Sequence, residues 1–244
     1  MEHYYLTDPG KVREQNEDSV IIVKNHSEEY LMAVADGMGG HSNGEVASSL
    51  AITHLADNFK SLKSIGTRED AMLWMRAITN EINALIYKYT EDNPTSTGMG
   101  TTLVMAIVTN DFLLFGNIGD SSGFVMRNGQ LHKITSDHTL VNLLVQSGEL
   151  SEKDAKEHPK KNVLMKALGA SVTAEIDVFD VESDVDGVFL CSDGMTNMLE
   201  PEQIAKVLKS DLSISEKIQK LIYKCNNRGG NDNISAAYLI KRGE

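Results

Sequence analysis

The sequence predicts an α+β fold in which two antiparallel β-sheets pack together and pairs of helices cover their outer faces. Short apolar runs bounded by turn residues recur along the chain and indicate strands. These runs come in groups separated by two pairs of amphipathic helices, instead of alternating strand by helix as parallel βαβ units do. We expect a four-layer α-β-β-α sandwich, because in this architecture the two sheets and the two helix pairs bury their apolar faces against one another.

The first third of the chain contains three short strands and two helices. Apolar residues predict strands at 3–7, 19–24 and 30–35. From Gly44 the apolar spacing changes to three and four residues, which is the period of a helix face. This spacing predicts one helix that runs towards Leu62 and a second across residues 74–89.

The middle of the chain predicts four strands in succession after a loop at 94–100. Turn signals separate the apolar runs, and Asn128-Gly129 is a strong hairpin signal. We therefore expect an antiparallel meander with strands at 102–108, 112–118, 123–127 and 131–134.

The last third begins with helical and irregular material between His138 and Gly169, where Ser151 and Asp154 form a capping pattern. Pro201 is well placed in the first turn of a helix. Further strands are expected at 173–181, 187–192 and 234–240, and helices at 201–210 and 213–226.

Composition limits the class of protein. The 244 residues, 41% of them hydrophobic and 24% charged, suit one globular domain over residues 1–244, since no linker divides the chain. The net charge of −12 argues against general affinity for nucleic acid or an anionic membrane surface. The two cysteines, Cys191 and Cys225, form no CxxC pair, and no signal peptide or membrane-spanning run is seen. We expect a cytoplasmic protein with reduced thiols.

Four aspartates stand at the ends of predicted strands. Asp36, Asp120 and Asp193 follow apolar runs and lie next to glycines, and Asp232 precedes the closing strand. One Asp-Gly after a strand is ordinary turn chemistry. If the strand ends converge, however, carboxylates about 4 Å apart repel each other by roughly 4 kcal/mol at an effective dielectric near 20. Such a cluster needs cations, and oxygen ligands without thiolates favour Mg²⁺ or Mn²⁺.

Three charged residues precede the second strand and can complete such a site. Glu17 and Asp18 add carboxylates, and Arg13 adds a planar guanidinium that can pair with two oxygens of a phosphate. Taken alone, Arg13 would more often be a surface ion-pair residue.

The order of these motifs resembles that of the metal-dependent protein serine/threonine phosphatases of the type 2C family, especially its single-domain bacterial members. Each motif is weak separately, but seven in the right order and spacing are highly specific. They cover essentially the whole chain: Arg13-x-x-Asn16-Glu17-Asp18, Ala35-Asp36-Gly37-Met38-Gly39-Gly40-His41-x-x-Gly44-Glu45, Gly98-Met99-Gly100-Thr101-Thr102, Asn117-Ile118-Gly119-Asp120-Ser121, Thr135-Ser136-Asp137-His138, Ser192-Asp193-Gly194 and Asp232-Asn233.

The resemblance implies a β-sandwich flanked by helices with a pair of metal ions, Mn²⁺ or Mg²⁺, at one end of the sheets. Asp36 would bridge the two ions and the Gly37 carbonyl would contact one of them, while Asp193 and Asp232 would complete the other. Asp120, together with Asp193, matches a weaker third metal position of bacterial relatives. Glu17 and Asp18 correspond by position to acids that act mainly through metal-bound waters in this family.

The same resemblance implies the reaction. A hydroxide held between two metals would attack phosphoserine or phosphothreonine in line, without a phospho-enzyme, while Arg13 holds the phosphate. His41 would supply a proton to the leaving alkoxide. A histidine in a polar glycine loop is equally consistent with a hydrogen-bonding role behind the metal ligands. His138 is expected to be structural.

The resemblance also implies partners, namely phosphorylated proteins that include a bacterial serine/threonine kinase and its substrates, and a monomeric state. Residues 139–170 correspond to the flap of such phosphatases. A basic stretch of the flap is either a docking surface for acidic protein or a solvated face. Many bacterial relatives carry arginine after Gly-Asp-Ser, where this chain has Ser122, and this departure either changes only a surface contact or alters substrate preference at that edge. The basic stretch contains Lys156, Lys160, Lys161 and Lys166 against Glu157.

Two other classes of protein fit the sequence less well. A different two-metal hydrolase, such as a phosphodiesterase or nuclease, is disfavoured by the lack of a basic groove and of histidine ligands. A non-catalytic module that binds a metal structurally is disfavoured because no DxDxDG-type loop is present. No acid is missing from the metal positions, which argues against a degenerate relative of the phosphatases.

Overall fold

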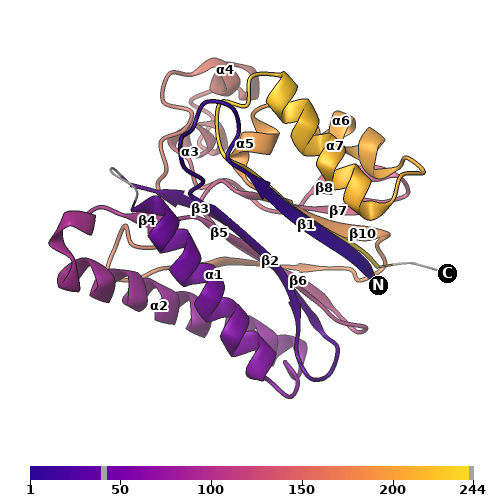
Figure 1. The fold of residues 1–244 in the computed structure, drawn as a ribbon, viewed down its shortest axis with the longest axis horizontal. Coiled ribbons are helices and arrows are strands. Elements are labelled where there is room, and N and C mark those ends of the chain that lie inside the picture. The colour runs from indigo at the N-terminus through magenta and orange to yellow at the C-terminus, as the bar shows by residue number, and fades with distance from the viewer. Residues whose placement is uncertain (40–42, 242–244) are drawn as a thin grey trace.

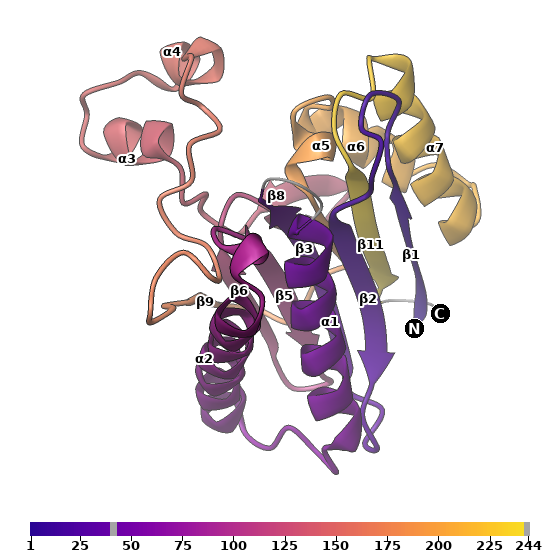
Figure 2. The ribbon, with the colours of Figure 1, turned by 60° about the vertical axis from the view of Figure 1, so that its left-hand side comes forward.

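The computed structural model, which describes residues 1–39 and 43–241, has the expected four layers (Figure 1). Two antiparallel sheets lie face to face, and helices cover both outer faces (Figure 2). On one side these are α1 (Gly44–Ser61) and α2 (Arg68–Asp92). On the other side they are α5 (Asp193–Thr196), α6 (Pro201–Leu208) and α7 (Ile214–Asn227).

The first sheet has the strand order β1-β11-β10-β7-β8, and each neighbouring pair is antiparallel. The second sheet has the order β2-β3-β5-β6-β9, with the short β4 paired to the end of β3. The strands are β1 (Glu2–Asp8), β2 (Asp18–Lys24), β3 (Tyr30–Met38), β4 (Gly100–Thr101), β5 (Leu103–Val108), β6 (Leu113–Ile118), β7 (Ser122–Arg127), β8 (Gln130–Lys133), β9 (Asp177–Val181), β10 (Gly187–Cys191) and β11 (Ile234–Ile240).

The core consists of three apolar layers. The central layer fills the space between the two sheets and includes Met32, Phe115 and Leu190. The other two layers lie between each sheet and its helices. The central strands are therefore buried on both faces, which explains why their sequences are continuous apolar runs without polar alternation.

The predicted meander is wrong, because its four strands belong to two different sheets. β5 and β6 pair in the second sheet, whereas β7 and β8 pair in the first. The chain crosses between the sheets just after β6, at Gly119, whose φ is +110°. A Cβ there would lie 2.6 Å from the Thr102 side chain, so glycine is required. When a strand is buried on both faces, its hydrophobic pattern does not indicate which sheet it joins. The crossing could therefore not be predicted from the hydrophobic pattern of the sequence.

Most other elements occur where the sequence predicts them, with small changes at their ends. The strand expected at 173–181 begins only at Asp177. The capping pattern at Ser151 forms, since its side chain accepts a hydrogen bond from the Asp154 amide. Pro201 opens α6 as expected.

The flap, residues 139–170, contains the short helices α3 (Leu140–Gln146) and α4 (Glu152–Glu157). It projects from one end of the sandwich, the end where β3 finishes (Figure 2). Among the helices of the described residues, none has the length and apolar character needed to cross a bilayer.

Candidate metal centre

The structure brings the strand-end acids together in one groove of about 470 Å³. Asp36 lies near the end of β3 and Asp120 just after β6, whereas Asp193 opens α5 directly after β10. Asp232 precedes β11, so both sheets contribute to the site. The groove is also lined by the predicted residues Arg13, Glu17 and Gly37, and by flap residues that include Met165 and Lys166.

Asp36 and Asp193 both line the groove, and their carboxyl groups lie close enough to perturb each other. Burial, followed by the charges of Asp18 and Asp193, raises the pKa of Asp36 well above its ordinary value. Burial is also the main cause of the raised pKa of Asp193, with the neighbouring Asp232 next. Crowding of buried carboxyl groups disfavours their charged forms, and a bound cation would offset this repulsion.

Asp18 lies at the start of β2, opposite Asp36 in the β2–β3 register, and only 6% of it is exposed. The Ser192 hydroxyl donates to Asp18 Oδ2 at 2.7 Å, while Asp18 Oδ1 has no partner among the described residues. Burial raises the pKa of Asp18 to about 7. A carboxylate oxygen that is buried away from water is unfavourable unless it has a partner. A cation or a water bound to a cation would provide that partner for Asp18 Oδ1.

Asp232 is held by Arg13 through two contacts. Arg13 Nε lies 3.0 Å from Asp232 Oδ1, and Arg13 Nη2 donates to Oδ2 at 3.0 Å. The side chains are 52% and 36% exposed, so this pair lies at the mouth of the groove. The guanidinium thus places a positive charge beside Asp232.

Glu17 and Gly37 belong to two loops that lock together. The Gly37 amide donates to the Glu17 carbonyl at 3.0 Å, and the Gly44 amide donates to the Glu17 carboxylate. Burial raises the pKa of Glu17. A Cβ on Gly37 would lie 2.1 Å from the Gly44 carbonyl oxygen, so this close approach of two backbones requires glycine.

Asp120 also lines the groove. Burial, with the neighbouring charge of Asp193, raises the pKa of Asp120 to about 7. Its turn is held on one side by Thr102, whose hydroxyl oxygen is 2.8 Å from that of Ser121. Thr102 Oγ1 also accepts from the Asp36 amide at 3.0 Å. One threonine therefore connects the ends of β3 and β6.

Thr102 and Asn233 are the residues whose contribution the sequence did not reveal. In the sequence, Thr101-Thr102 could either assist the site or simply favour a strand, and Asn233 was part of a motif without a role. Asn233 Oδ1 accepts from the Glu17 amide at 2.8 Å, and its Nδ2 donates to the carbonyls of Pro9 and Gln15. It therefore positions the Arg13–Glu17 loop. The Asp-Asn motif was the only sequence signal that could have indicated it.

The residues of this groove fit divalent cations in their chemistry. Asp18 Oδ1 and Asp193 Oδ1 are buried without partners, and the donor set consists of carboxylates beside a glycine backbone. Within residues 1–39 and 43–241, no three acidic, histidine or cysteine side chains already converge on one point as a finished ligand set. Arg13 pairs with Asp232, so a cation held by Asp232 would compete with this ion pair.

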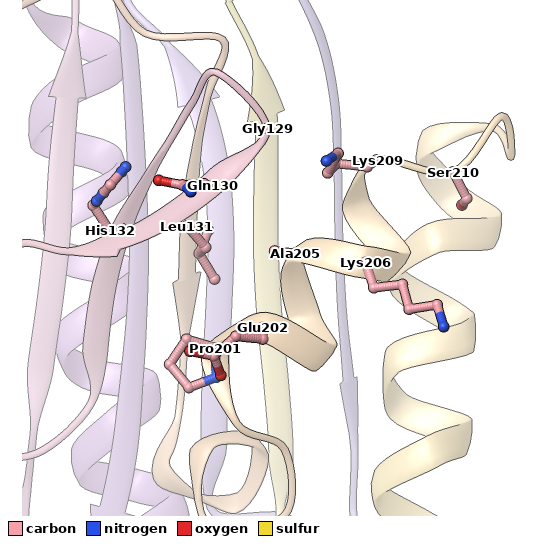
Figure 3. Close-up of a pocket in the computed structure, with 10 residues that line it drawn as sticks. All are labelled: Gly129, Gln130, Leu131, His132, Pro201, Glu202, Ala205, Lys206, Lys209 and Ser210. Atoms are coloured by element: carbon pink, nitrogen blue, oxygen red, sulfur yellow. The ribbon is translucent and has the colours of Figure 1, made fainter.

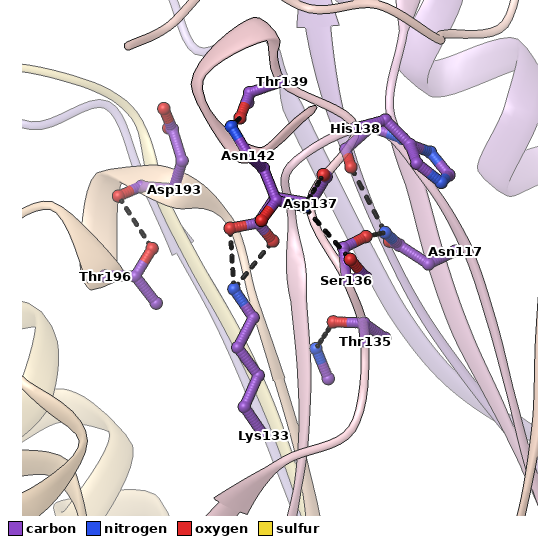
Figure 4. A network of polar contacts seen from close by, with 12 residues as sticks. Asn117, Lys133, Thr135, Ser136, Asp137, His138, Thr139, Asn142, Asp193 and Thr196 are labelled. Atoms are coloured by element: carbon purple, nitrogen blue, oxygen red, sulfur yellow. Dashed lines mark hydrogen bonds and ion pairs between the residues drawn. The ribbon is translucent and has the colours of Figure 1, made fainter. Parts of the chain in front are cut away.

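The other predicted residues lie as follows. His41 is outside the described residues. His138 contacts the turn before Asp120 and belongs to a polar network at the flap base (Figure 4). Ser122 is 1% exposed within β7 and does not reach the groove. On the flap, Lys156 pairs with Glu200, and Lys166 with Asp177.

A second cavity, of about 570 Å³, lies between β8 and α6 (Figure 3). Its lining includes Leu131, Ala205 and Lys209, and Glu202 is its single acid. One carboxylate cannot hold a pair of divalent ions, so this cavity is no alternative metal centre.

Comparison with known proteins gives one consistent result. The family description "Protein phosphatase 2C" matches residues 11–233. "Serine/threonine phosphatase stp" of Listeria monocytogenes is 41% identical over 239 residues, covering 98% of this chain and 94% of that protein. "Protein phosphatase PhpP" of Streptococcus pneumoniae is 36% identical over 242 residues, covering 98% and 97%. The crystal structure of serine/threonine phosphatase Stp1 from Staphylococcus aureus superposes with a TM-score of 0.94 at 32% identity, covering 99% and 95%.

Proposed function

The chain belongs to the protein phosphatase 2C family, and from this premise we propose that its carboxylate groove is the centre at which phosphoserine and phosphothreonine in proteins are hydrolysed. It is a metal-dependent protein serine/threonine phosphatase, as its family and relatives establish. The observation that supports the location is the convergence of Asp36, Asp120, Asp193 and Asp232 on one groove, beside buried carboxylate oxygens without partners. Such a site is electrostatically incomplete without cations.

Four residues would hold two divalent ions, Mn²⁺ or Mg²⁺, and one more acid would support a third. Asp36 would contact both ions and the Gly37 carbonyl one of them, while Asp193 and Asp232 would hold the other. Asp120 would join Asp193 at the third position. Glu17 and Asp18 would act through waters, because Asp18 is buried and is not among the residues that line the groove, and Glu17 is tied to the Gly44 amide. When bound, these ions supply positive charge to the phosphoryl oxygens and make water acidic enough to act as a nucleophile near neutral pH.

Arg13 would bind the substrate phosphate. Its guanidinium already lies at the mouth of the groove, where both of its contacts go to Asp232. Once the charge of Asp232 is neutralised, the guanidinium fork can turn to the phosphate oxygens and fix the phosphorus for in-line attack. Arg13 also offsets the repulsion between this acidic surface and a dianionic phosphate.

The leaving serine or threonine alkoxide needs a proton. We assign this step to His41, directly or through water, from its place in the Gly37–His41 loop of the sequence.

The proposed partners follow from the reaction. We infer that a bacterial serine/threonine kinase and its substrates are dephosphorylated, in the cytoplasm, by a monomeric protein. We also infer that residues 1–244 form one catalytic domain. Phosphorylated proteins are the substrate class of the family, whereas the kinase, the cell compartment and the oligomeric state are our inferences.

The test is phosphate release from a phosphothreonine peptide by protein stripped with chelator and then resupplied with Mn²⁺, Mg²⁺ or Ca²⁺. A phosphotyrosine peptide and a phosphodiester serve as comparison substrates. We expect turnover of the phosphothreonine peptide with Mn²⁺ or Mg²⁺ but not Ca²⁺. The Asp193→Asn variant should be inactive, and the exposed Asp211→Asn variant should match the wild type. An active Asp193→Asn variant would refute the location of the centre.

A further inference from the structure

The cavity between β8 and α6 lies beside a strand with a free edge. β8 is the last strand of its sheet, and β7 is its one neighbour among the described strands. The cavity has a volume of about 570 Å³, and β8 with its turn forms one wall while α6 forms the other (Figure 3). Leu131, Pro201 and Ala205 contribute apolar surface. None of these residues lines the carboxylate groove.

The hairpin register decides which backbone groups of β8 are free. The turn residues Asn128-Gly129 have φ values of +52° and +72°, the left-handed conformation of a two-residue type I′ turn. The pair Arg127–Gln130 that flanks such a turn is hydrogen-bonded, and hydrogen-bonded pairs alternate along an antiparallel ladder. The N–H and C=O groups of Leu131 and Lys133 therefore point away from β7.

The contacts around β7 agree with this alternation. Met126 is opposite Leu131, and its carbonyl accepts from the Asp186 amide at 2.8 Å, on the side of β7 that faces away from β8. Within residues 1–39 and 43–241, Leu131 and Lys133 make no backbone hydrogen bond outside the ladder. The edge of β8 thus offers two donors and two acceptors to an added strand.

The cavity is basic although the chain as a whole has a net charge of −12. Lys206 and Lys209 line it, and Glu202 is its single acid. The Lys209 side chain extends over the hairpin turn, since its Cε would lie 2.8 Å from a Cβ on Gly129 (Figure 3). In the part of the chain that the structure describes, neither lysine belongs to an ion pair. The charge complements an acidic ligand.

An adjoining pocket of about 730 Å³ leads from this cavity to the metal centre. It shares Pro201 with the cavity, and it shares Asp120 and Asp193 with the carboxylate groove. Lys133, the last residue of β8, also lines this pocket, where its Nζ donates to both carboxylate oxygens of Asp137 at 2.7 Å (Figure 4). A peptide bound along β8 is therefore directed towards the carboxylates.

We propose that the cavity between β8 and α6 is a docking site for an extended acidic segment of the phosphoprotein substrate, which adds as a strand to the free edge of β8. Leu131 and Lys133 bind the main chain of the segment, and Lys206 and Lys209 bind its acidic side chains. The inference rests on the proposed function, because the phosphorylated residue of the same substrate occupies the carboxylate groove. The four residues of β8 span roughly 14 Å, so the acidic segment lies at least about four residues from the phosphorylated one.

The test compares phosphothreonine peptides that share one short core sequence. The extended peptides add a block of glutamates beyond a spacer of at least about four residues, placed before the phosphothreonine in one version and after it in the other. KM and kcat are measured with Mn²⁺ at low salt on the full chain. Lys209→Glu reverses the charge in the cavity. Lys220→Glu makes the same change at an exposed lysine of α7 and is the matched control.

We expect the glutamate block, on the side that reaches the cavity, to lower the KM of the wild type about five- to tenfold while kcat is unchanged. Lys209→Glu should lose this gain and keep the KM of the short peptide, and Lys220→Glu should match the wild type. A lysine block in place of the glutamates should restore the gain on Lys209→Glu. N-methylation of alternate amides in the segment should remove the gain in one register only, because an added strand donates every second N–H to its neighbour.

The docking site is disproved if neither glutamate block lowers KM, if N-methylation has no effect in either register, or if Lys220→Glu loses the gain as Lys209→Glu does. It is also disproved if the wild type is a dimer that Lys209→Glu dissociates, since the cavity then belongs to a second copy of the chain. The short peptide keeps the two proposals apart. If it is turned over with Mn²⁺ and the block adds nothing, the docking site alone fails, whereas no turnover of any peptide refutes the proposed function as well.

Discussion

Replacing Asp18 by asparagine should stabilise the metal-free protein at high pH while weakening its response to metal. Asp18 is 6% exposed, and burial raises its pKa from 3.8 to about 7. Asparagine has the same shape, its Oδ1 can still accept from Ser192, and its Nδ2 can donate where Oδ1 of the aspartate has no partner. The substitution therefore removes a charge without removing the packing.

The sign of the pH dependence follows from the direction of the pKa shift. The pKa of Asp18 is higher in the folded than in the unfolded protein. The contribution of Asp18 to the free energy of unfolding is therefore most favourable below about pH 4, and it is lost as pH rises towards 7. The loss grows by about 1.4 kcal/mol per pH unit between these values and reaches roughly 4 kcal/mol above pH 7. Asp18→Asn should regain up to this amount at pH 8, and only about 1 kcal/mol at pH 4.5.

The assay is thermal unfolding of chelated wild type and Asp18→Asn at pH 4.5, 6 and 8. For a chain of this length, roughly 4 kcal/mol corresponds to a rise in Tm of about 8 to 16 °C at pH 8. Asp211→Asn should match the wild type at each pH. With saturating Mn²⁺ the order should reverse, since the variant binds the cation less tightly and gains less from it. The reasoning would be refuted if chelated Asp18→Asn had a lower Tm than the chelated wild type at pH 8, or if its Tm differed from the wild type by the same amount at all three pH values.

Three further substitutions test other parts of the site. Arg13→Ala should raise KM for phosphopeptide at least about tenfold, the usual effect of losing a charged hydrogen-bond pair. Calorimetry should find Mn²⁺ binding unimpaired, and a loss of binding would show that Arg13 acts on the ligands instead. His41→Ala should slow hydrolysis of an alkyl phosphate far more than that of p-nitrophenyl phosphate, whose oxyanion leaves without a proton. Equal losses on both substrates would exclude the acid role. Gly37→Ala should lower the free energy of unfolding by about 1–3 kcal/mol, since its Cβ would lie 2.1 Å from the Gly44 carbonyl oxygen. Denaturant unfolding measures this change, and an unchanged midpoint would contradict the required contact.

The order of the elements and the residue types of the site could be predicted from the sequence. Apolar periodicity is a local property, so α2 and the strands β2 and β3 occur close to where the pattern predicts them. The acids of the groove were also identifiable, because each stands at the boundary between an apolar run and a glycine turn. Their roles as ligands remain proposals.

Pairing between distant strands was not predictable from local patterns. β6 and β7 are neighbours in sequence and were expected to pair, yet they lie in different sheets because the chain crosses at Gly119. Strands buried on both faces have no polar alternation that marks a partner or a sheet. The sequence also did not indicate that Thr102 joins Asp36 to the Asp120 turn.

The sequence by itself determined which chemical groups this protein has and in what order they follow along the chain. It contains carboxylates beside glycines, one arginine near them and no thiolate cluster, which restricts the chemistry to hard cations and phosphate. Only the tertiary structure decided which of these groups meet. It joins Arg13 to Asp232, leaves Asp18 Oδ1 without a partner and ties the flap to Gly119 through His138. These contacts depend on how distant strands pack, and packing is set by the whole core and not by any local stretch of sequence.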